Sequence, residues 1–164
     1  MSNLLSQLYS LKQVWRLGEL TSDEYDIYIF LRPDLEYLDP LEAKVVFGQI
    51  LDGGTDLVTP SWHQWGGLND RFAFCSRKGA EAYALRLDLV EEFCAETGHL
   101  NAEELLSYVA AKTSLRLRYT NMRAMRIRAD GATLREGFEL PPPIFVRGIV
   151  RKRVHRLRTI IRRV

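Results

Sequence analysis

The stretch Tyr25-Asp-Ile-Tyr-Ile-Phe-Leu-Arg-Pro-Asp34 decides the fold class that we predict for this chain. Its first seven residues are aromatic and β-branched with almost no polar interruption, which is typical of a buried central strand. Pro33 cannot donate a hydrogen bond to a neighbouring strand, so the strand must end before it. Because ligands bind at the carboxyl ends of strands in open α/β sheets, we expect Asp34 to lie at a binding site.

The segments around this strand show helical and strand-like patterns in turn, which predicts an α/β fold. An amphipathic helix is expected over Asn3–Leu17, and Gly18 is expected to end it. Asn101 and Glu104 have the spacing of a capping box, which predicts the start of another helix. The remaining predictions are a helix over 78–96 and strands over 44–51, 56–59, 71–75, 115–119 and 125–129.

Composition and charge narrow the class of protein. A length of 164 residues with 46% hydrophobic residues is typical of one soluble globular domain. No apolar run is long enough to span a bilayer, and the two cysteines form no Cys-x-x-Cys pair, so we expect a cytoplasmic protein. The formal net charge of +2 combines −10 over residues 1–111, +4 over 112–139 and +8 over 140–164. This asymmetry indicates an anionic partner for the basic end.

The first candidate site surrounds the end of the predicted central strand and comprises Arg32, Asp34, Glu36 and Asp39. A carboxylate at this place can hold a divalent cation such as Mg²⁺ or Mn²⁺, which in turn neutralises a diphosphate. Arg32 would contact phosphate through two parallel hydrogen bonds. The alternative is a solvated turn with a local Arg–Asp pair.

The second candidate site is the loop Trp62-His-Gln-Trp-Gly-Gly-Leu-Asn-Asp-Arg71. Its indoles offer flat faces for stacking on sugars or bases, and the paired glycines let the backbone come close to a ligand. Asp70 is a candidate general base, and His63 a candidate hydrogen-bond donor or acid. The alternative is that the tryptophans belong to the core and the glycines only make a turn.

Three segments follow one another in the order Leu5–Trp15, Tyr25–Leu35 and Trp65–Ala73. In this order they resemble bacterial and algal glycosyltransferase-like proteins related to the WavE lipopolysaccharide-synthesis group. The motif Arg126-Ile-Arg-Ala-Asp-Gly131 is similar to a late motif of the same proteins. The resemblance covers residues 3–131, and its most specific part is Gly-Gly-Leu-Asn-Asp-Arg-Phe with Arg-Pro-Asp upstream.

The resemblance implies that residues 1–139 form part of a GT-A type domain, with a partial Rossmann-like mixed sheet flanked by helices. The implied activity is transfer of a sugar from a nucleotide-diphosphate-sugar to a surface-glycan or lipid-linked acceptor. In this family an Asp-x-Asp holds the metal, and Asp34 stands at the equivalent place. Asp70 would be the catalytic base. The other implied substrate-binding residues are Arg32, Trp62, His63, Trp65, Gly66, Gly67, Asn69 and Arg71.

The N-terminal strand–helix–strand units of this family, which build most of its nucleotide pocket, have no counterpart in the printed sequence. We therefore expect a truncated copy or a chain that a second chain completes. A non-catalytic, membrane-associated or partner-binding remnant of a glycosyltransferase is the alternative function.

Residues 140–164 form the second predicted unit. A Pro-Pro-Pro spacer at 141–143 precedes an apolar stripe at helical spacing, and eight basic residues fill the other faces. Such a basic amphipathic helix can lie on an anionic membrane surface, which predicts a peripheral position on the inner membrane. The alternatives are packing on a protein surface and, as a third function class, nucleic-acid binding. The absence of aromatic residues after Phe145 disfavours base stacking.

Overall fold

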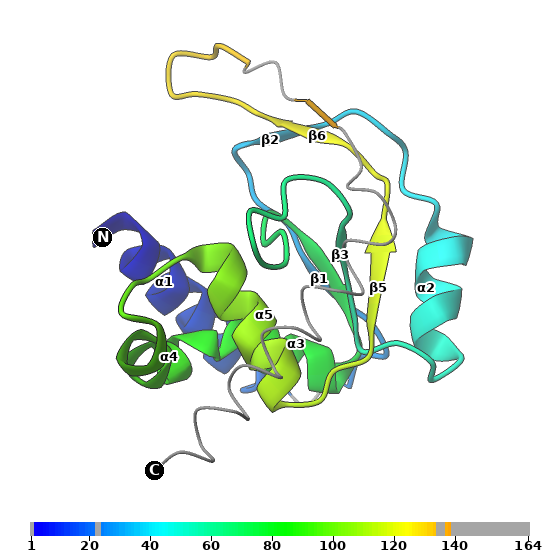
Figure 1. Ribbon diagram of the computed structural model, residues 1–164. Coiled ribbons are helices and arrows are strands. Elements are labelled where there is room, and N and C mark those ends of the chain that lie inside the picture. Colours follow the sequence, from blue (N-terminus) through cyan, green and yellow to red (C-terminus); the bar gives the residue numbers. More distant parts are fainter. Residues whose placement is uncertain (1, 22–23, 134–136, 139–164) are drawn as a thin grey trace.

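The computed structural model describes residues 2–21, 24–133 and 137–138 and confirms the α/β class (Figure 1). Within these residues, five α-helices and one 3₁₀ helix accompany a four-stranded mixed sheet and a separate two-stranded antiparallel sheet. The basic helix expected in 140–164 lies outside the described residues. The helices are α1 (Ser2–Gly18), α2 (Ala43–Leu51), α3 (Arg77–Ala84), η1 (Arg86–Leu89), α4 (Val90–Thr97) and α5 (Ala102–Lys112). The strands are β1 (Tyr28–Phe30), β2 (Leu35–Tyr37), β3 (Leu57–Pro60), β4 (Ala73–Cys75), β5 (Leu117–Thr120) and β6 (Ala124–Arg126).

The larger sheet has the order β1-β4-β3-β5, with β3 and β5 parallel and the other pairs antiparallel. Its strands are short. Successive side chains of a strand point to opposite faces of the sheet, so neighbouring residues pack into different hydrophobic clusters. Leu57 and Cys75 belong to one buried cluster, whereas Val58 and Phe74 belong to another. The central strands are thus covered on both faces.

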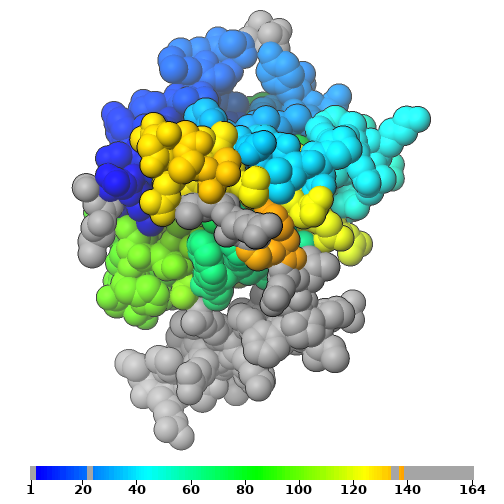
Figure 2. Space-filling view, turned by 90° about the horizontal axis from the view of Figure 1, so that it is seen from above, coloured from blue at the N-terminus to red at the C-terminus, as the bar shows by residue number. Residues whose placement is uncertain are grey.

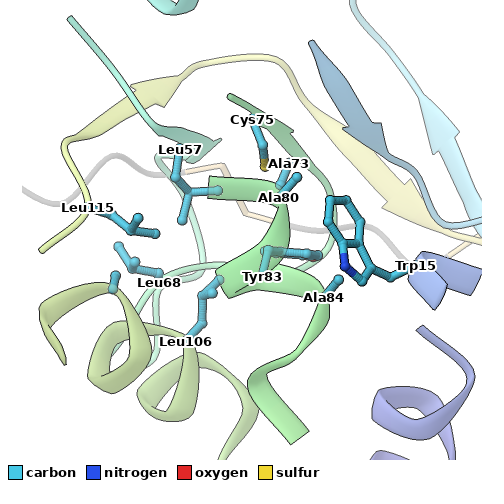
Figure 3. Packing of buried hydrophobic residues seen from close by; sticks show 11 residues of the cluster. Trp15, Leu57, Leu68, Ala73, Cys75, Ala80, Tyr83, Ala84, Leu106 and Leu115 are labelled. Atoms are coloured by element: carbon cyan, nitrogen blue, oxygen red, sulfur yellow. The ribbon is translucent and has the colours of Figure 1, made fainter. Parts of the chain in front are cut away.

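Helices α1, α3 and α5 cover one face of this sheet, and α2 covers the other (Figure 1). Figure 3 shows how Trp15 of α1, Leu57 of β3, Tyr83 of α3 and Leu106 of α5 converge on the first face. A third buried cluster joins Leu8 of α1 to α4 and α5. No helix in the described part of the chain is long and apolar enough to cross a membrane.

The prediction that Tyr25–Leu31 forms a buried central strand is wrong in position. The strand exists as β1, but among the described residues it is an edge strand whose one partner is β4, and Ile29 and Leu31 are exposed. A continuous apolar run is typical of central strands, yet this one uses its apolar side chains to contact α1 and line a cleft described below.

The predicted strand over 44–51 is helix α2 instead. Val46 and Ile50, four residues apart, are its buried residues, while Val45 and Leu51 are exposed. A short apolar run fits either a strand or one face of a helix, and packing against Val58 and Phe74 selects the helix.

The predicted helix over 78–96 is present but is broken into α3, η1 and α4. Helix α3 ends at Ala84, and a 3₁₀ turn starts at Arg86, although neither glycine nor proline marks the break. The capping prediction for the following helix is confirmed, since the Asn101 side chain accepts a hydrogen bond from the Glu104 N–H at 2.9 Å.

Candidate active site

A cleft of about 750 Å³ opens between α1 and the end of β1. Its apolar wall comes from α1 and β1, including Leu8, Leu11, Val14, Ile29 and Phe30. Five charged side chains line the remainder: Arg32, Asp34, Asp70, Arg71 and Arg86. The structure therefore brings parts of both candidate sites into one cavity, although Asp34 and Asp70 belong to segments that are far apart in the sequence.

Arg32 and Asp34 form a bidentate ion pair at the mouth of this cleft. The Arg32 Nε donates to Asp34 Oδ1 at 2.9 Å, and its Nη2 donates to Oδ2 at 2.7 Å. Hydrogen bonding from Arg32 lowers the pKa of Asp34, and the same contact raises the pKa of Arg32. Both side chains are about one-third exposed, so they are accessible from the cleft.

Asp70 accepts hydrogen bonds from two residues of the α3–η1 segment, Tyr83 and Arg86. Its carboxylate accepts a hydrogen bond from Arg86 Nη2 at 3.1 Å, and its backbone carbonyl accepts one from the Tyr83 hydroxyl at 2.7 Å. The Arg86 guanidinium carbon lies 4.1 Å from the centre of the Tyr83 ring, and Arg86 Nη1 donates to the Tyr83 carbonyl. Together these contacts hold both the backbone and the carboxylate of Asp70.

Sequence reasoning did not identify Tyr83 and Arg86 as site residues. The helical pattern of 78–96 places them on a continuous helix, and their role depends on the break after Ala84. Arg86 is only 4% exposed, which is a rare degree of burial for an arginine without a functional or structural partner. Burial also raises the pKa of Tyr83, so its phenol stays protonated and can donate to Asp70.

Two of the predicted substrate-binding residues in the Trp62–Arg71 loop, Trp62 and Asn69, are core residues. Trp62 is 1% exposed, donates from Nε1 to the Met122 carbonyl and packs with Phe72 and Phe74. Asn69 is equally buried and closes the loop, since its Nδ2 donates to the Trp62 carbonyl and its Oδ1 accepts from the Arg71 N–H. Both side chains are therefore packed inside the fold, as the alternative of a core tryptophan has it for Trp62.

Trp65, by contrast, is 59% exposed. Its ring stacks on His63 with centroids 5.0 Å apart, and the Arg71 guanidinium lies 5.7 Å from the Trp65 ring centre and 5.1 Å from that of Trp62. His63 and Trp65 both adopt a positive φ, a conformation that is uncommon for residues other than glycine. Arg71 thus links the cleft to an exposed aromatic platform of Trp65 and His63.

The paired glycines of this loop make their close contact with α5. A Cβ on Gly67 would lie 1.9 Å from the Glu103 carbonyl oxygen, and one on Gly66 would lie 3.2 Å from a Glu104 carboxylate oxygen. The Leu68 N–H donates to the same Glu103 carbonyl at 2.9 Å. The space beside Gly67, where a ligand was expected to approach, is therefore filled by the first turn of α5.

A second hollow of about 650 Å³ adjoins the cleft and shares Pro33 and Asp34 with it. It adds two arginines from the segment around β6, Arg126 and Arg128. Figure 2 shows this segment (yellow) between α1 (dark blue) and the β1–β2 region (lighter blue). The two hollows together are lined by five arginines and two aspartates, so their formal charge is +3.

The residues at the strand end do not fit the divalent cation that the resemblance implies. Mg²⁺ and Mn²⁺ require several oxygen ligands, but both oxygens of Asp34 are bound to Arg32, and Arg126 Nε lies 3.5 Å from one of them. Asp39 of the same predicted cluster is paired with Arg123 outside the cleft. Across residues 2–21, 24–133 and 137–138, no group of three His, Cys, Asp or Glu side chains is placed to hold a metal ion.

The comparisons with known proteins add no assignment: no family, no curated protein and no solved structure matches this chain.

Proposed function

We propose that this chain is a glycosyltransferase-like protein, similar to the WavE group, whose cleft binds a nucleotide-diphosphate-sugar. The observation that carries the proposal is that Arg32 and Asp34 line the same cavity as Asp70 and Arg71. These residues come from two of the segments that carry the resemblance, Tyr25–Leu35 and Trp65–Ala73. The mixed sheet is consistent with a partial GT-A type domain, although its larger part is antiparallel.

Each charged residue has a role in this proposal. Arg32 and Arg71 would contact the phosphates, because guanidinium groups bind phosphate oxygens in a planar, bidentate manner. Asp70 is the candidate base that accepts a proton from the acceptor hydroxyl, and Arg86 fixes its carboxylate. The exposed face of Trp65 is available for stacking on a sugar ring.

The experiment is titration of the purified full-length chain with UDP-sugars and GDP-sugars, followed by a transfer assay. We expect saturable binding, and we expect Asp70→Asn to abolish transfer while the variant still folds and binds the donor. Retained transfer by Asp70→Asn would remove Asp70 from the mechanism. Absence of nucleotide-sugar binding under all conditions would contradict the proposal.

A second candidate function is a non-catalytic binding module. The specific observation in its favour is that Asp34 and Asp70 are both ion-paired with arginines, a state that suits binding rather than proton transfer. The same titration separates the two functions, because a module binds the donor without turnover and its Asp70→Asn variant behaves like the wild type.

We further propose that the basic segment 144–164 attaches the protein to an anionic membrane surface on the cytoplasmic side. Flotation of the full chain with anionic liposomes, compared with duplex binding at matched salt, tests this attachment. Preference for the duplex would favour the nucleic-acid function instead.

A further inference from the structure

We propose that the cleft binds the diphosphate group of its ligand through arginine side chains alone, without a divalent cation. The nucleotide-sugar identity of the ligand rests on the proposed function above. The diphosphate subsite itself rests on three features of the cleft: occupied carboxylates, an excess of positive charge and a buried arginine with an unused donor.

The carboxylates of the cleft are already engaged. Asp34 uses both oxygens for Arg32, and Asp70 binds the almost fully buried guanidinium of Arg86. A cation at Asp34 would have to displace a bidentate, charge-assisted pair and would meet the guanidinium of Arg126 next to it. A cation is therefore disfavoured at the place where the resemblance puts one.

The arginines supply the charge that a metal ion would otherwise supply. Arg32, Arg71 and Arg86 line the cleft, and Arg126 and Arg128 line the hollow that continues from it past Asp34. The formal charge of +3 over both hollows complements a diphosphate, and guanidinium groups bind phosphate oxygens in a planar, bidentate manner.

Arg86 provides a second, independent indication that a ligand binds in the cleft, which it lines. Its side chain is 5% exposed, and its Nε has no hydrogen-bond partner among the described residues. Buried polar donors are rarely left unpaired in folded proteins, so an orphaned one next to a cavity indicates a missing acceptor. Because Arg86 lines the cleft, a phosphate oxygen bound there is a candidate for this acceptor.

The test is calorimetric titration of the full-length chain with inorganic pyrophosphate and, separately, with UDP. Each titration is run once in EDTA and once in excess MnCl₂. We expect pyrophosphate to bind in EDTA, and Mn²⁺ to leave the affinity unchanged or weaken it, because complexed pyrophosphate carries less negative charge. A requirement for Mn²⁺, or no binding of pyrophosphate in either buffer, would overturn the proposal.

Substitutions sharpen the test, because the two modes of binding predict opposite effects at Asp34. If arginines hold the diphosphate, Asp34→Asn frees Arg32 and removes a repelling charge, so affinity in EDTA stays equal or rises. If a metal ion holds it, Asp34→Asn abolishes binding. Arg32→Gln should weaken binding by about tenfold or more, which is the scale of one lost charge-assisted contact.

The matched control is the pair Asp39 and Arg123, which has the same bidentate geometry but lies outside the cleft. Asp39→Asn and Arg123→Gln should leave pyrophosphate affinity unchanged, and an effect as large as that of Arg32→Gln would overturn the proposal. Binding of pyrophosphate without binding of UDP or UDP-sugars would support the subsite while contradicting the proposed function. Both arginine–aspartate pairs are partly exposed, so we expect all four variants to fold, which circular dichroism verifies.

Discussion

Arg86 donates a hydrogen bond to the carboxylate of Asp70 at 3.1 Å, although in the sequence Asp70 precedes β4 and Arg86 follows it, 16 positions later. The contact ties the break between α3 and η1 to the end of the Trp62–Arg71 loop. Helix α3 ends at Ala84 and the 3₁₀ turn η1 begins at Arg86, so the contact is made from the first residue after the break. The proposed catalytic base is therefore positioned by an element that the sequence pattern assigned to an ordinary helix.

We expect Arg86→Ala to lower the free energy of unfolding by about 3 kcal/mol, because it leaves a largely buried carboxylate unpaired. Urea denaturation monitored by circular dichroism measures the change. The control is Lys112→Ala, which breaks the exposed pair with Glu92 and should cost less than about 1 kcal/mol. Equal losses for the two variants would show that the Arg86–Asp70 pair contributes no more than a surface pair.

Gly67→Ala should destabilise the protein by about 3 kcal/mol or more, because the added Cβ would collide with the Glu103 backbone carbonyl. Gly48→Ala is the matched control. Gly48 lies inside α2 with nothing within 4 Å of the position of an added Cβ, so alanine should stabilise the helix by about 0.5–1 kcal/mol. Thermal denaturation of both variants tests the opposite signs, and a tolerated Gly67→Ala would contradict the contact with α5.

The two tryptophans of the loop should respond differently to truncation. Trp62→Ala removes a core side chain and should cost about 3–5 kcal/mol. Trp65→Ala removes an exposed ring and its contacts with Arg71 and His63, so it should cost less than about 1 kcal/mol. Acrylamide quenching of tryptophan fluorescence provides a second measurement. Because Trp65 is exposed and Trp62 is buried, the fluorescence that remains in Trp65→Ala should be quenched less than that of the wild type. A large stability loss for Trp65→Ala would show that the platform is structural.

Stability should fall in acid through the ion pair of Asp56 with Arg116, which joins the starts of β3 and β5. Arg116 lowers the pKa of Asp56 from its ordinary value of 3.8 to about 2. Because the folded-state pKa is the lower one, the pair stabilises the fold above about pH 4 and loses this effect as the pH falls toward 2. The contribution is about 2.5 kcal/mol at most, since one pKa unit corresponds to about 1.4 kcal/mol.

Denaturant titrations of the wild type and Asp56→Asn between neutral pH and pH 2 measure this contribution. The variant should be less stable at neutral pH, and the difference between the two proteins should shrink in acid. A constant difference for Asp56→Asn would contradict the assigned pH dependence.

Local sequence patterns predict those helices and strands whose periodicity or capping residues lie within a few consecutive positions. The periodic leucines of 3–17, the capping pair Asn101 and Glu104, and the strands near 56–59 and 71–75 all have counterparts in the structure. The segment 44–51 was misassigned because its apolar residues fit both periods, and only contact with the sheet distinguishes them. The edge position of β1 is not predictable from its residues, because an apolar composition indicates that side chains are buried but does not indicate the order of the strands in the sheet.

The sequence by itself determined the α/β class, the uneven charge and the two segments that line the cleft. Side-chain type and spacing along the chain are enough for these properties, since they depend on neighbours within a few residues. Tertiary structure alone decided that Arg86 binds Asp70 and that Gly67 packs on α5. These contacts join residues from separate elements, and no local rule of propensity or period specifies which separate elements meet.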